Sequence, residues 1–377
     1  MNIENSPDII VIGGGIAGIS AAAELSSDAR VVVLEAEPVT GYHATGRSAA
    51  IYIRNYGNSV LRAINAASEP TLAQPDGICD HSLLSPRGEL LIASEAELPE
   101  LERYAAGSTG LERMTGCEAA QMVPILKPGP IAAAIYESGA QSIDVDRMLQ
   151  GYLRLLKRRG GRVITSSRTS DITYSAGLWH VIAGGRTYTA PRIVNAAGAW
   201  ADEVAKLAGV ATIGLQPMRR SAVLLSLGPE HDVARWPLFG TVAETWYAKP
   251  EAGKLMVSPA DEDPVDPHDA WPDDMVLAEG LDRYEQAVTV PVTRVERSWA
   301  GLRSFAPDRT PVLGFAKENE GFFWLAGQGG YGVQTAPALS QAAAALISGR
   351  TPALAPDILA TLAPSRFFHK PVKELLQ

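Results

Sequence analysis

The sequence has little cysteine and no excess of positive charge. Its two cysteines, Cys79 and Cys117, are too few for a disulfide framework, so we interpret both as reduced thiols of a cytoplasmic protein. The formal net charge of −9 at pH 7 argues against nucleic acid or an anionic membrane as the main partner, because both select for basic surfaces. No set of residues predicts a metal site.

Long apolar runs are also missing. The run from Ile9 to Ala23 holds 15 uncharged residues, whereas a membrane-spanning helix needs roughly 18 or more. The residues before it include Glu4 and Asp8 and no basic residue, unlike a secretory signal. We therefore expect a buried strand and helix here. The chain of 377 residues favours two domains, and its acidic stretch 258–274 is typical of a solvated connection.

The amino-terminal run contains a nucleotide-binding pattern. Ile9–Ile12 predicts a strand, an alanine-rich helix pattern follows, and Val31–Leu34 predicts a second strand. Three glycines between strand and helix have the G-x-G-x-x-G spacing: Gly13, Gly15 and Gly18. They allow a tight turn, close approach of a pyrophosphate and close packing of helix on strand. Glu35 ends the second strand, where a carboxylate accepts hydrogen bonds from ribose hydroxyls. This order predicts dinucleotide binding.

The glycine pattern does not distinguish NAD from FAD, but the rest of the chain does. Residues 161–209 predict a meander of short strands that closes on "NAAGAW", and "GFFWLAGQGGYGVQT" near the C-terminus precedes an alanine-rich helix pattern. In this order the three features resemble the glutathione-reductase-like FAD fold. More narrowly, they resemble the superfamily of D-amino-acid oxidase and of glycine and sarcosine oxidase.

Within this superfamily the chain is similar to bacterial D-arginine dehydrogenase. The matching stretches are "GYHATGRSAA", "LLSPRGE", "LQPMRRSA", "YAKPEAG", "WAGLRSFAPD" and "GFFWLAGQGGYGVQT". The resemblance covers essentially the full length and implies an α/β fold with an α+β insert. It places a discontinuous Rossmann-type FAD-binding domain at 1–50, 143–211 and 304–377. A smaller mixed-sheet substrate domain occupies 51–142 and 212–303.

The resemblance also implies how FAD is held. Neither cysteine lies in the C-terminal third, where sarcosine oxidases tether their flavin, so we expect non-covalent FAD. A histidyl link through His43 is the alternative. Small residues after the second strand suit a chain that lies flat against a ring system, and Arg47 would contact phosphate. The predicted FAD contacts are Gly13, Gly15, Ile16, Ala17, Gly18, Glu35, Ala36, Thr45, Gly46, Arg47, Ser48, Ala49, Ala197, Gly198, Gly329, Gly330, Tyr331, Gly332, Val333 and Gln334.

The implied reaction is oxidative deamination of a D-amino acid, with hydride transfer from Cα to flavin N5. The imino acid product hydrolyses to a 2-oxo acid and ammonia. Two guanidiniums suit a carboxylate because each can bond to it bidentately. The residues predicted to be catalytic are Tyr56, Arg220, Tyr247, Arg303 and Gly330. Arg219 is the alternative to Arg220. In the turn Gly329–Gly332, carbonyl groups accept from the amine, and the next helix N-terminus stabilises negative charge on the flavin.

Glu89 is the residue on which specificity depends, because its position matches the guanidinium acceptor of the D-arginine dehydrogenases. The predicted substrate contacts are Ile51, Tyr56, Glu89, Arg220, Tyr247, Arg303, Gly330 and Tyr331. Ile51 replaces a polar histidine of that family, Ile53 replaces a nearby threonine, and Arg54 adds a positive charge to the same loop. These departures leave the exact substrate open.

Two other functions remain open. An oxidase of secondary amines or 2-hydroxy acids would keep Arg303 and the flavin and would make Glu89 irrelevant. A nucleotide-binding protein without turnover is disfavoured by the arginines and tyrosines. We expect a small amino-acid substrate, a quinone or another electron acceptor, and a monomer or homodimer. A peripheral contact with the inner membrane is left open.

Overall fold

The amino-terminal apolar run forms the centre of a sheet in the computed structural model, which describes residues 6–368. Strand β1 (Ile9–Ile12) is fully buried and pairs in parallel with β2 (Val31–Leu34) and β13 (Arg192–Asn195). The six strands lie in the order β20 (Val312–Phe315), β21 (Phe322–Ala326), β13, β1, β2 and β9 (Arg162–Ile164). Only β20 runs antiparallel to its neighbour. The expected buried strand and helix are confirmed.

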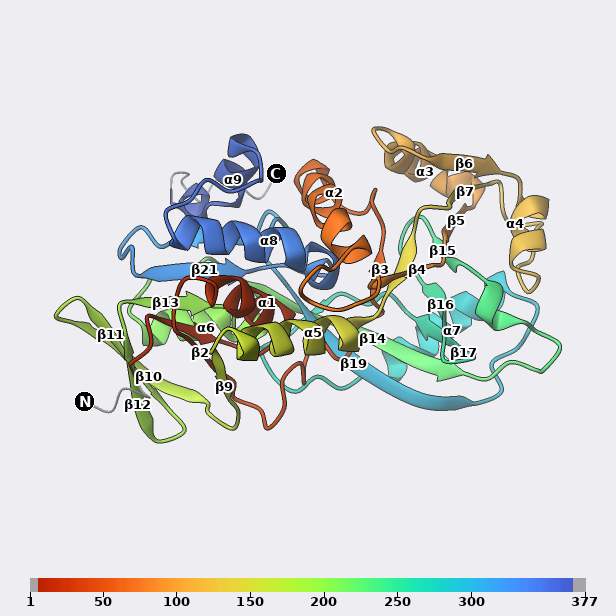
Figure 1. Cartoon of the computed structure of the whole chain (residues 1–377). Helices are drawn as coiled ribbons and strands as arrows, with labels where there is room; N and C mark the ends of the chain where they lie inside the picture. Colours follow the sequence, from red (N-terminus) through yellow and green to blue (C-terminus); the bar gives the residue numbers. More distant parts are fainter. Residues whose placement is uncertain (1–5, 369–377) are drawn as a thin grey trace.

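Alternate residues of β1 belong to two different apolar cores, because successive side chains of a strand point to opposite faces. Ile9 and Val11 pack in the core with the helices α1 (Ile16–Leu25), α5 (Val145–Arg158) and α8 (Gly332–Ile347). Ile10 and Ile12 pack in the core on the other face. That face is covered by α6 (Ala201–Leu207) and the antiparallel strands β10 (Thr169–Ser175), β11 (Leu178–Ala183) and β12 (Arg186–Ala190). Figure 1 shows these layers on the side of the molecule that holds both termini.

The second half of the molecule is built on a mixed sheet. Its path is β18 (Asp263–Pro264), β14 (Gln216–Leu225), β17 (Lys254–Ser258), β16 (Tyr247–Glu251), β15 (Leu238–Thr241), β5 (Glu89–Ala93), β7 (Ala133–Glu137) and β6 (Leu111–Met114). The long strand β19 (Val295–Phe305) pairs antiparallel with β14. The helices of this second half are α3 (Leu98–Ala105), α4 (Gly116–Met122) and α7 (Asp274–Ala287). A parallel-sheet half joined to a mixed-sheet half confirms the predicted fold class.

The two halves meet at a small antiparallel sheet of β3 (Ile51–Tyr52), β8 (Gln141–Ile143) and β4 (Leu84–Pro86). The predicted boundary at residue 51 assigns α2 (Ser59–Ala73) to the substrate half. The helix contributes Ile64 and Leu72 to the core that contains α1 and α8, and it lies beside α8 in Figure 1. The domain bounds stay a prediction. The helix α9 (Pro356–Leu362) belongs to the same core. Of the predicted domain segments, residues 1–5 and 369–377 lie outside the described residues.

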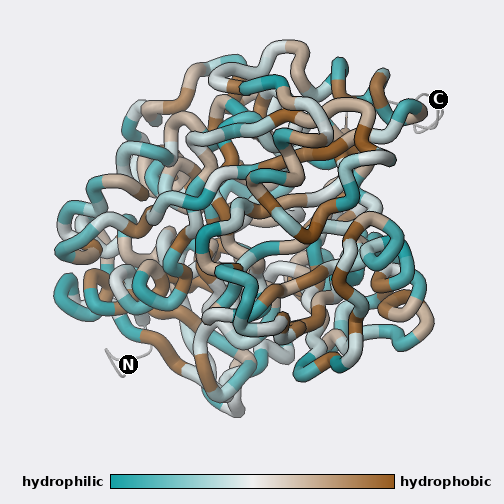
Figure 2. Tube along the Cα trace, turned by 90° about the vertical axis from the view of Figure 1, so that its right-hand side faces the viewer, coloured by the Kyte–Doolittle hydropathy of each residue, from teal (hydrophilic) through white to brown (hydrophobic). Residues whose placement is uncertain are grey.

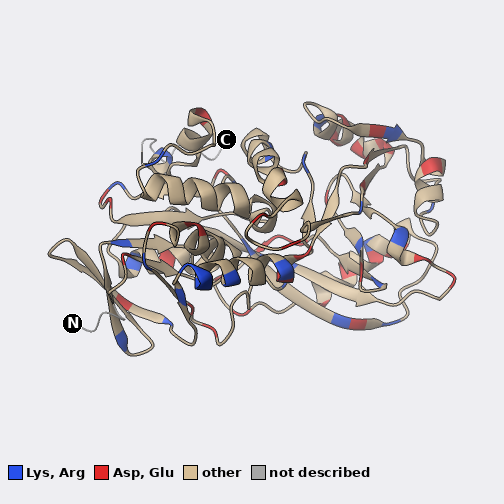
Figure 3. Ribbon diagram, in the orientation of Figure 1, with Lys and Arg blue, Asp and Glu red and all other residues tan. Residues whose placement is uncertain are grey.

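Apolar and charged residues are distributed differently over the molecule. Figure 2 shows apolar stretches of chain running through the middle of the molecule, with hydrophilic stretches at outer turns. Charges of both signs are distributed over both halves, and α5 carries several basic residues (Figure 3). No helix between residues 6 and 368 is long and apolar enough to cross a membrane.

The acidic stretch 258–274 differs from the solvated connection expected from its sequence. Asp261 is buried and accepts hydrogen bonds from the Ser221 backbone N–H at 2.6 Å and from its hydroxyl at 2.8 Å. Asp263 forms an ion pair with Arg219 at 2.7 Å. The carboxylates are therefore fixed against β14 because they satisfy donors of that strand, which a charge count along the sequence does not reveal.

Candidate active site

The strand–helix turn at the amino terminus has the geometry that its glycines predict. Gly13 has a φ of +112°, and a Cβ there would lie 2.3 Å from the Ala196 carbonyl oxygen. A Cβ on Gly18 would lie 2.0 Å from the Gly13 carbonyl oxygen. Any side chain at either position would clash with backbone, so both glycines permit close packing of strand and helix. The Ile16 N–H at the start of α1 donates to the Thr45 hydroxyl at 3.0 Å.

Glu35 lies at the end of β2 as predicted, and its carboxylate is held by backbone. One oxygen accepts from the Gly14 N–H at 2.5 Å, and the other accepts from the Glu37 N–H at 2.7 Å. These bonds fix the carboxylate beside the glycine turn. A ribose contact stays a prediction, and it is compatible with this position because each carboxylate oxygen can accept more than one hydrogen bond.

A cavity begins at this turn and fits an elongated dinucleotide. It runs past Glu35 and the end of β13 to the turn before α8, and its lining includes many glycines and alanines. Two of its polar side-chain atoms are buried without a hydrogen-bond partner: Gln328 Nε2 and Thr169 Oγ1. Buried polar atoms normally have partners, so these two are available to a ligand. The predicted residues on this cavity are Gly13, Gly15, Ile16, Ala17, Glu35, Ala36, Thr45, Ala197, Gly198, Gly329 and Gly332.

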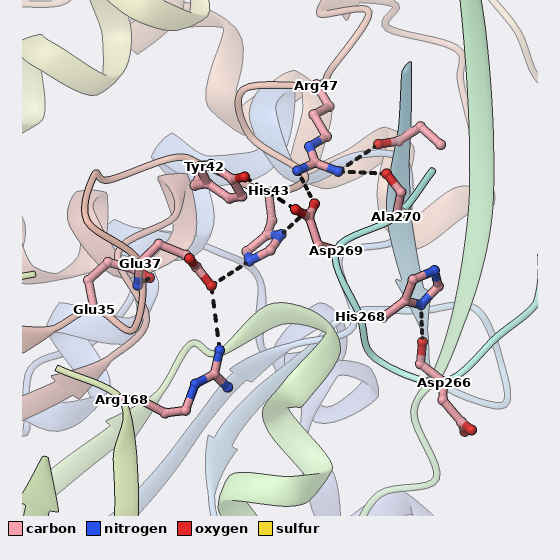
Figure 4. Close-up of polar contacts among 11 residues, drawn as sticks. Glu35, Glu37, Tyr42, His43, Arg47, Arg168, Asp266, His268, Asp269 and Ala270 are labelled. Atoms are coloured by element: carbon pink, nitrogen blue, oxygen red, sulfur yellow. Dashed lines mark hydrogen bonds and ion pairs between the residues drawn. The ribbon is translucent and has the colours of Figure 1, made fainter. Parts of the chain in front are cut away.

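The Arg47 side chain contacts other groups of the protein and is not free to bind a phosphate. Its guanidinium pairs with Asp269 and donates to the carbonyls of Ala270 at 2.9 Å and Ala300 at 3.0 Å (Figure 4). A phosphate contact by Arg47 stays a prediction, and it would require this cluster to open. His43 lies 3.1 Å from Glu37 and 4.0 Å from Asp269, so its ring nitrogens face carboxylates.

A second cavity shares residues with the first and extends into the mixed-sheet half. The structure brings many of the predicted residues together along its wall: Thr45, Arg47, Ser48, Ala49, Ile51, Tyr56, Glu89, Arg220, Tyr247, Arg303, Gly329, Gly330, Gly332, Val333 and Gln334. Tyr331 is not on this wall, and its ring packs on Tyr56 with centroids 4.8 Å apart. Gly46 lines a separate neighbouring cavity.

Two arginines reach the second cavity from paired strands. Arg220 lies on β14 and Arg303 on β19, and Met218 is the residue directly opposite Arg303. Arg220 is 8% exposed. It donates to Glu262 at 3.0 Å, while its Nε and Nη1 are buried without partners. No hydrogen bond or ion pair holds the Arg303 guanidinium among residues 6–368. Both arginines therefore present free donors to an anion.

The neighbouring Arg219 is a less suitable ligand. Adjacent residues of a strand point to opposite faces, and Arg219 forms an ion pair with Asp263 away from the cavity wall. Tyr56 and Tyr247 complete the wall around the arginines. Burial raises the pKa of Tyr56 far above its usual range, so its hydroxyl stays neutral and can both donate and accept.

Glu89 faces the cavity from the start of β5 and is 6% exposed. The Tyr104 hydroxyl donates to its Oε2 at 3.0 Å. Burial, then the nearby carboxylate of Glu137, raise the pKa of Glu89 to about 8, against the opposing effect of the Tyr104 hydrogen bond. Among the described residues no lysine or arginine forms an ion pair with Glu89. With no cation beside it, the Glu89 carboxyl group is therefore largely neutral below this pKa.

The isoleucine loop has an apolar cavity side and a charged outer side. Ile51 and Ile53 both line the cavity. The Ile53 N–H donates to the Gln334 side chain at 3.0 Å, which ties the loop to α8. Arg54 adds its charge to the outer side of this loop, where its exposed guanidinium pairs with Glu69 at 2.9 Å.

Sequence reasoning missed several polar residues of the two cavities. Gln328 precedes the predicted glycine turn directly and could have been included. Tyr104 and Glu244 line the second cavity from α3 and from the turn before β16. Glu244 has a φ of +51°, a strained value for a residue other than glycine. Nothing in the local sequence of either residue indicates a site, because only the folded mixed sheet brings them to Glu89.

Comparison with known proteins assigns the chain to a family. The family described as "FAD dependent oxidoreductase" (DAO) matches residues 8–346. The hydrogen cyanide synthase subunit HcnC of Pseudomonas aeruginosa is 30% identical over 180 residues, which cover 47% of this chain and 38% of that subunit. Less than two thirds of that relative is therefore matched.

Solved structures show the same fold. Glycine oxidase from Geobacillus kaustophilus has a TM-score of 0.83 at 21% identity, covering 96% of this chain and 99% of that one. L-proline dehydrogenase from P. horikoshii has a TM-score of 0.82 at 21% identity, covering 97% and 98%. Because the family match extends over most of the chain, the protein belongs to the DAO family of FAD-dependent oxidoreductases.

Proposed function

We propose that this FAD-dependent oxidoreductase deaminates D-amino acids oxidatively and favours those with basic side chains, as the D-arginine dehydrogenases do. The observation that carries the proposal is the arrangement of charge in the second cavity. Two arginines with free donors lie on one part of its wall, and a buried glutamate without a cation lies on another. An α-amino acid with a cationic side chain complements both. The D configuration rests on the resemblance of the sequence motifs.

The arginines supply the anchor for the substrate carboxylate. Arg220 has two buried N–H groups without partners, and Arg303 is held by no other side chain of the described residues. Each guanidinium can bond a carboxylate bidentately, and such charge-assisted bonds are about twice as strong as neutral ones. Tyr56 and Tyr247 add hydroxyl groups beside the same anchor. The Gly330 carbonyl is the proposed acceptor for the amine.

FAD is proposed to bind at the glycine turn of β1 and α1, at the segment Thr45–Ala49 and at the turn Gly329–Gly332. When bound, FAD supplies the acceptor for the two electrons removed from the substrate. The protein contributes position: the anchor and Glu89 fix both ends of the substrate, so that the reacting carbon is held in one orientation. FAD is proposed to be non-covalent, and acid precipitation should then release it from the protein without proteolysis.

Glu89 would select the side chain. A guanidinium or ammonium group at Glu89 stabilises its charged form, whereas an apolar side chain leaves the carboxyl group protonated and unpaired. The apolar surface of Ile51 and Ile53 fits the methylene groups of a long basic side chain and also fits apolar substrates. We therefore propose a broad range of D-amino acids with a preference for arginine and lysine.

The experiment is anaerobic mixing of the yellow protein with a panel of D- and L-amino acids, sarcosine and 2-hydroxy acids. Bleaching by D-arginine and D-lysine is expected. Glu89→Leu should weaken kcat/KM for these two by about 2–5 kcal/mol, the range for removing one partner of a buried charge pair. D-leucine should be nearly unaffected.

The exposed Glu112 of β6 offers a matched control, because Glu112→Leu removes the same charge away from the cavity. A uniform loss across basic and apolar substrates in Glu89→Leu would show that Glu89 is structural. Oxidation of sarcosine or a hydroxy acid, with no D-amino acid oxidised, would contradict the proposal. The carboxylate anchor would then serve the alternative reaction.

A further inference from the structure

Glu89 does not stand alone at its end of the cavity. It lies directly across the antiparallel pair β5–β7 from Glu137, and Glu137 is 4% exposed. The Tyr104 hydroxyl connects the two carboxyl groups, at 3.0 Å from Glu89 Oε2 and 3.5 Å from Glu137 Oε2. Two buried carboxyl groups on either side of one hydroxyl disfavour two negative charges, so one of them tends to keep its proton. We call Glu89 and Glu137 the acid pair and Tyr104 its bridge.

Glu137 also holds the loop that carries the substrate-contacting residues. Its Oε1 accepts from the Arg54 backbone N–H at 3.2 Å, and its Oε2 accepts from Asn55 Nδ2 at 2.8 Å. Asn55 is 3% exposed and is itself fixed to Thr109. Glu137 does not line the cavity, so it reaches a substrate only through Glu89, Tyr104 and this loop.

The acid pair has no cation of its own. Among residues 6–368 no lysine or arginine forms an ion pair with Glu89 or Glu137, and Arg54 is directed to Glu69. The charged and titratable groups around the pair and on the facing cavity wall are Arg47, Tyr52, Arg54, Tyr56, Arg62, Glu69, Tyr104, Arg220, Glu244, Tyr247 and Arg303. Of the arginines, Arg220 and Arg303 are assigned to the carboxylate anchor. Arg47 pairs with Asp269, Arg54 pairs with Glu69, and Arg62 lies over the Tyr104 ring. Glu89 itself is therefore paired with no cation of the described residues.

We infer that Glu137 and Tyr104 are positioning residues for substrate specificity: both aim Glu89 at the cavity, Glu137 favours a proton on Glu89 that a cationic side chain displaces, and Tyr104 stabilises the charged form that results. On binding, the O–H bond of the protonated carboxyl breaks, the proton leaves to solvent, and the carboxylate pairs with the cation. This inference rests on the proposed function, since it requires a basic side chain at Glu89. It goes further by assigning a role to two residues behind the contacting carboxylate.

The direction of the pH dependence follows from the groups around Glu89. Burial and the carboxylates of Glu137 and Glu244 raise its pKa to about 8, and the Tyr104 hydroxyl lowers it. Glu89 is therefore largely neutral below this pH and charged above it. Affinity for a permanently charged guanidinium should rise as the pH increases through about 8, because less work is then needed to remove the proton.

A non-reacting probe separates binding from turnover. The compound 5-guanidinopentanoate carries the carboxylate and guanidinium of arginine and lacks the α-amine, and heptanoate is an apolar control of similar length. Binding to the holoenzyme is measured calorimetrically at neutral pH in two buffers of different ionisation enthalpy. We expect release of about one proton with the guanidino acid and none with heptanoate.

Two substitutions should move the pH profile in opposite directions. Glu137→Gln removes a neighbouring charge, so the midpoint of guanidino-acid affinity should fall by about one pH unit. Tyr104→Phe removes the hydrogen bond to the charged form, so the midpoint should rise. KM for D-arginine should follow these midpoints, while kcat at saturation changes less than about twofold, because the anchor at the reacting end is intact. Glu112→Gln is the matched control and should shift nothing.

Each result tests either the inference about Glu137 and Tyr104 or the proposed function. Proton release with opposite shifts supports the inference. Binding without proton release, or shifts of the same sign in both variants, overturns it. A failure of the probe to bind, together with no oxidation of D-arginine or D-lysine, contradicts the proposed function itself. Normal oxidation of basic D-amino acids with unshifted variants leaves the proposed function in place and shows that Glu137 and Tyr104 are only structural.

Discussion

The two cavities hold their glutamates in different ways. Glu35 in the cofactor cavity accepts from two backbone N–H groups, those of Gly14 and Glu37. Glu89 in the substrate cavity accepts from one phenol and faces a second carboxyl group. The first glutamate is satisfied by backbone donors, and the pKa of the second is raised because it is buried without a cation among the described residues. Under the proposed function, the first cavity takes a constant ligand and the second selects substrates by charge.

The largest expected effect tests the charged end of the substrate cavity. Arg303→Leu should lower kcat/KM for all amino-acid substrates by at least about 10²-fold. It removes a charge-assisted anchor of roughly 1.5–3 kcal/mol and also misplaces the reacting carbon. Steady-state kinetics measure the loss of activity, and flavin absorbance per protein measures the FAD content. Loss of FAD with the mutation would show that Arg303 supports the fold, and near-normal activity would place it outside the site.

The next prediction tests the backbone-lined cofactor cavity. Gly18→Val places a branched side chain where a Cβ alone would lie 2.0 Å from the Gly13 carbonyl oxygen. Overpacking of this kind typically costs about 1–3 kcal/mol of stability. Thermal unfolding and FAD content should both fall. Gly177→Val is the control. It introduces the same valine in the turn before β11, where a Cβ meets no atom within 4 Å. The positive φ of Gly177 adds strain there, but no clash. Equal FAD loss in both variants would contradict the close-packing argument.

A smaller effect is expected at the isoleucine loop. Ile51→His restores a polar side chain on the cavity wall, and one hydrogen bond contributes about 0.5–1.5 kcal/mol. The ratio of kcat/KM for D-arginine to that for D-leucine should rise accordingly. The ratio is internal, so changes in folding or FAD content cancel. An unchanged or lower ratio would show that the substrate side chain does not pass Ile51.

The smallest effect is expected at the partly exposed pair of Arg47 and Asp269. Asp269 is 41% exposed at its side chain, and pairs of this kind are worth about 0.2–1 kcal/mol. Asp269→Asn should therefore weaken FAD binding by only a few-fold, measured as the Kd for reconstitution of the apoprotein. A loss of 100-fold or more would show that the cluster around Arg47 closes the cofactor cavity.

The sequence predicted the strand–glycine–helix unit well because its signals are local. The turn at Gly13, the helix after it and Glu35 lie within one continuous segment, and each requirement is set by neighbours in the chain. The substrate half was predicted less completely. Arg220, Arg303 and Glu89 were assigned by resemblance, and Tyr104 and Glu137 were not identified.

By itself the sequence determined the strand–glycine–helix unit, the α/β class and the types of residue available for the site. Tertiary structure decided which of them meet. Strand pairing places Glu137 opposite Glu89 although 48 positions separate them, and α3 then brings the Tyr104 hydroxyl between them. Strand alternation directs Arg220 to the cavity and Arg219 to Asp263. Such contacts depend on sheet register and side-chain burial, which arise only when distant segments pack together.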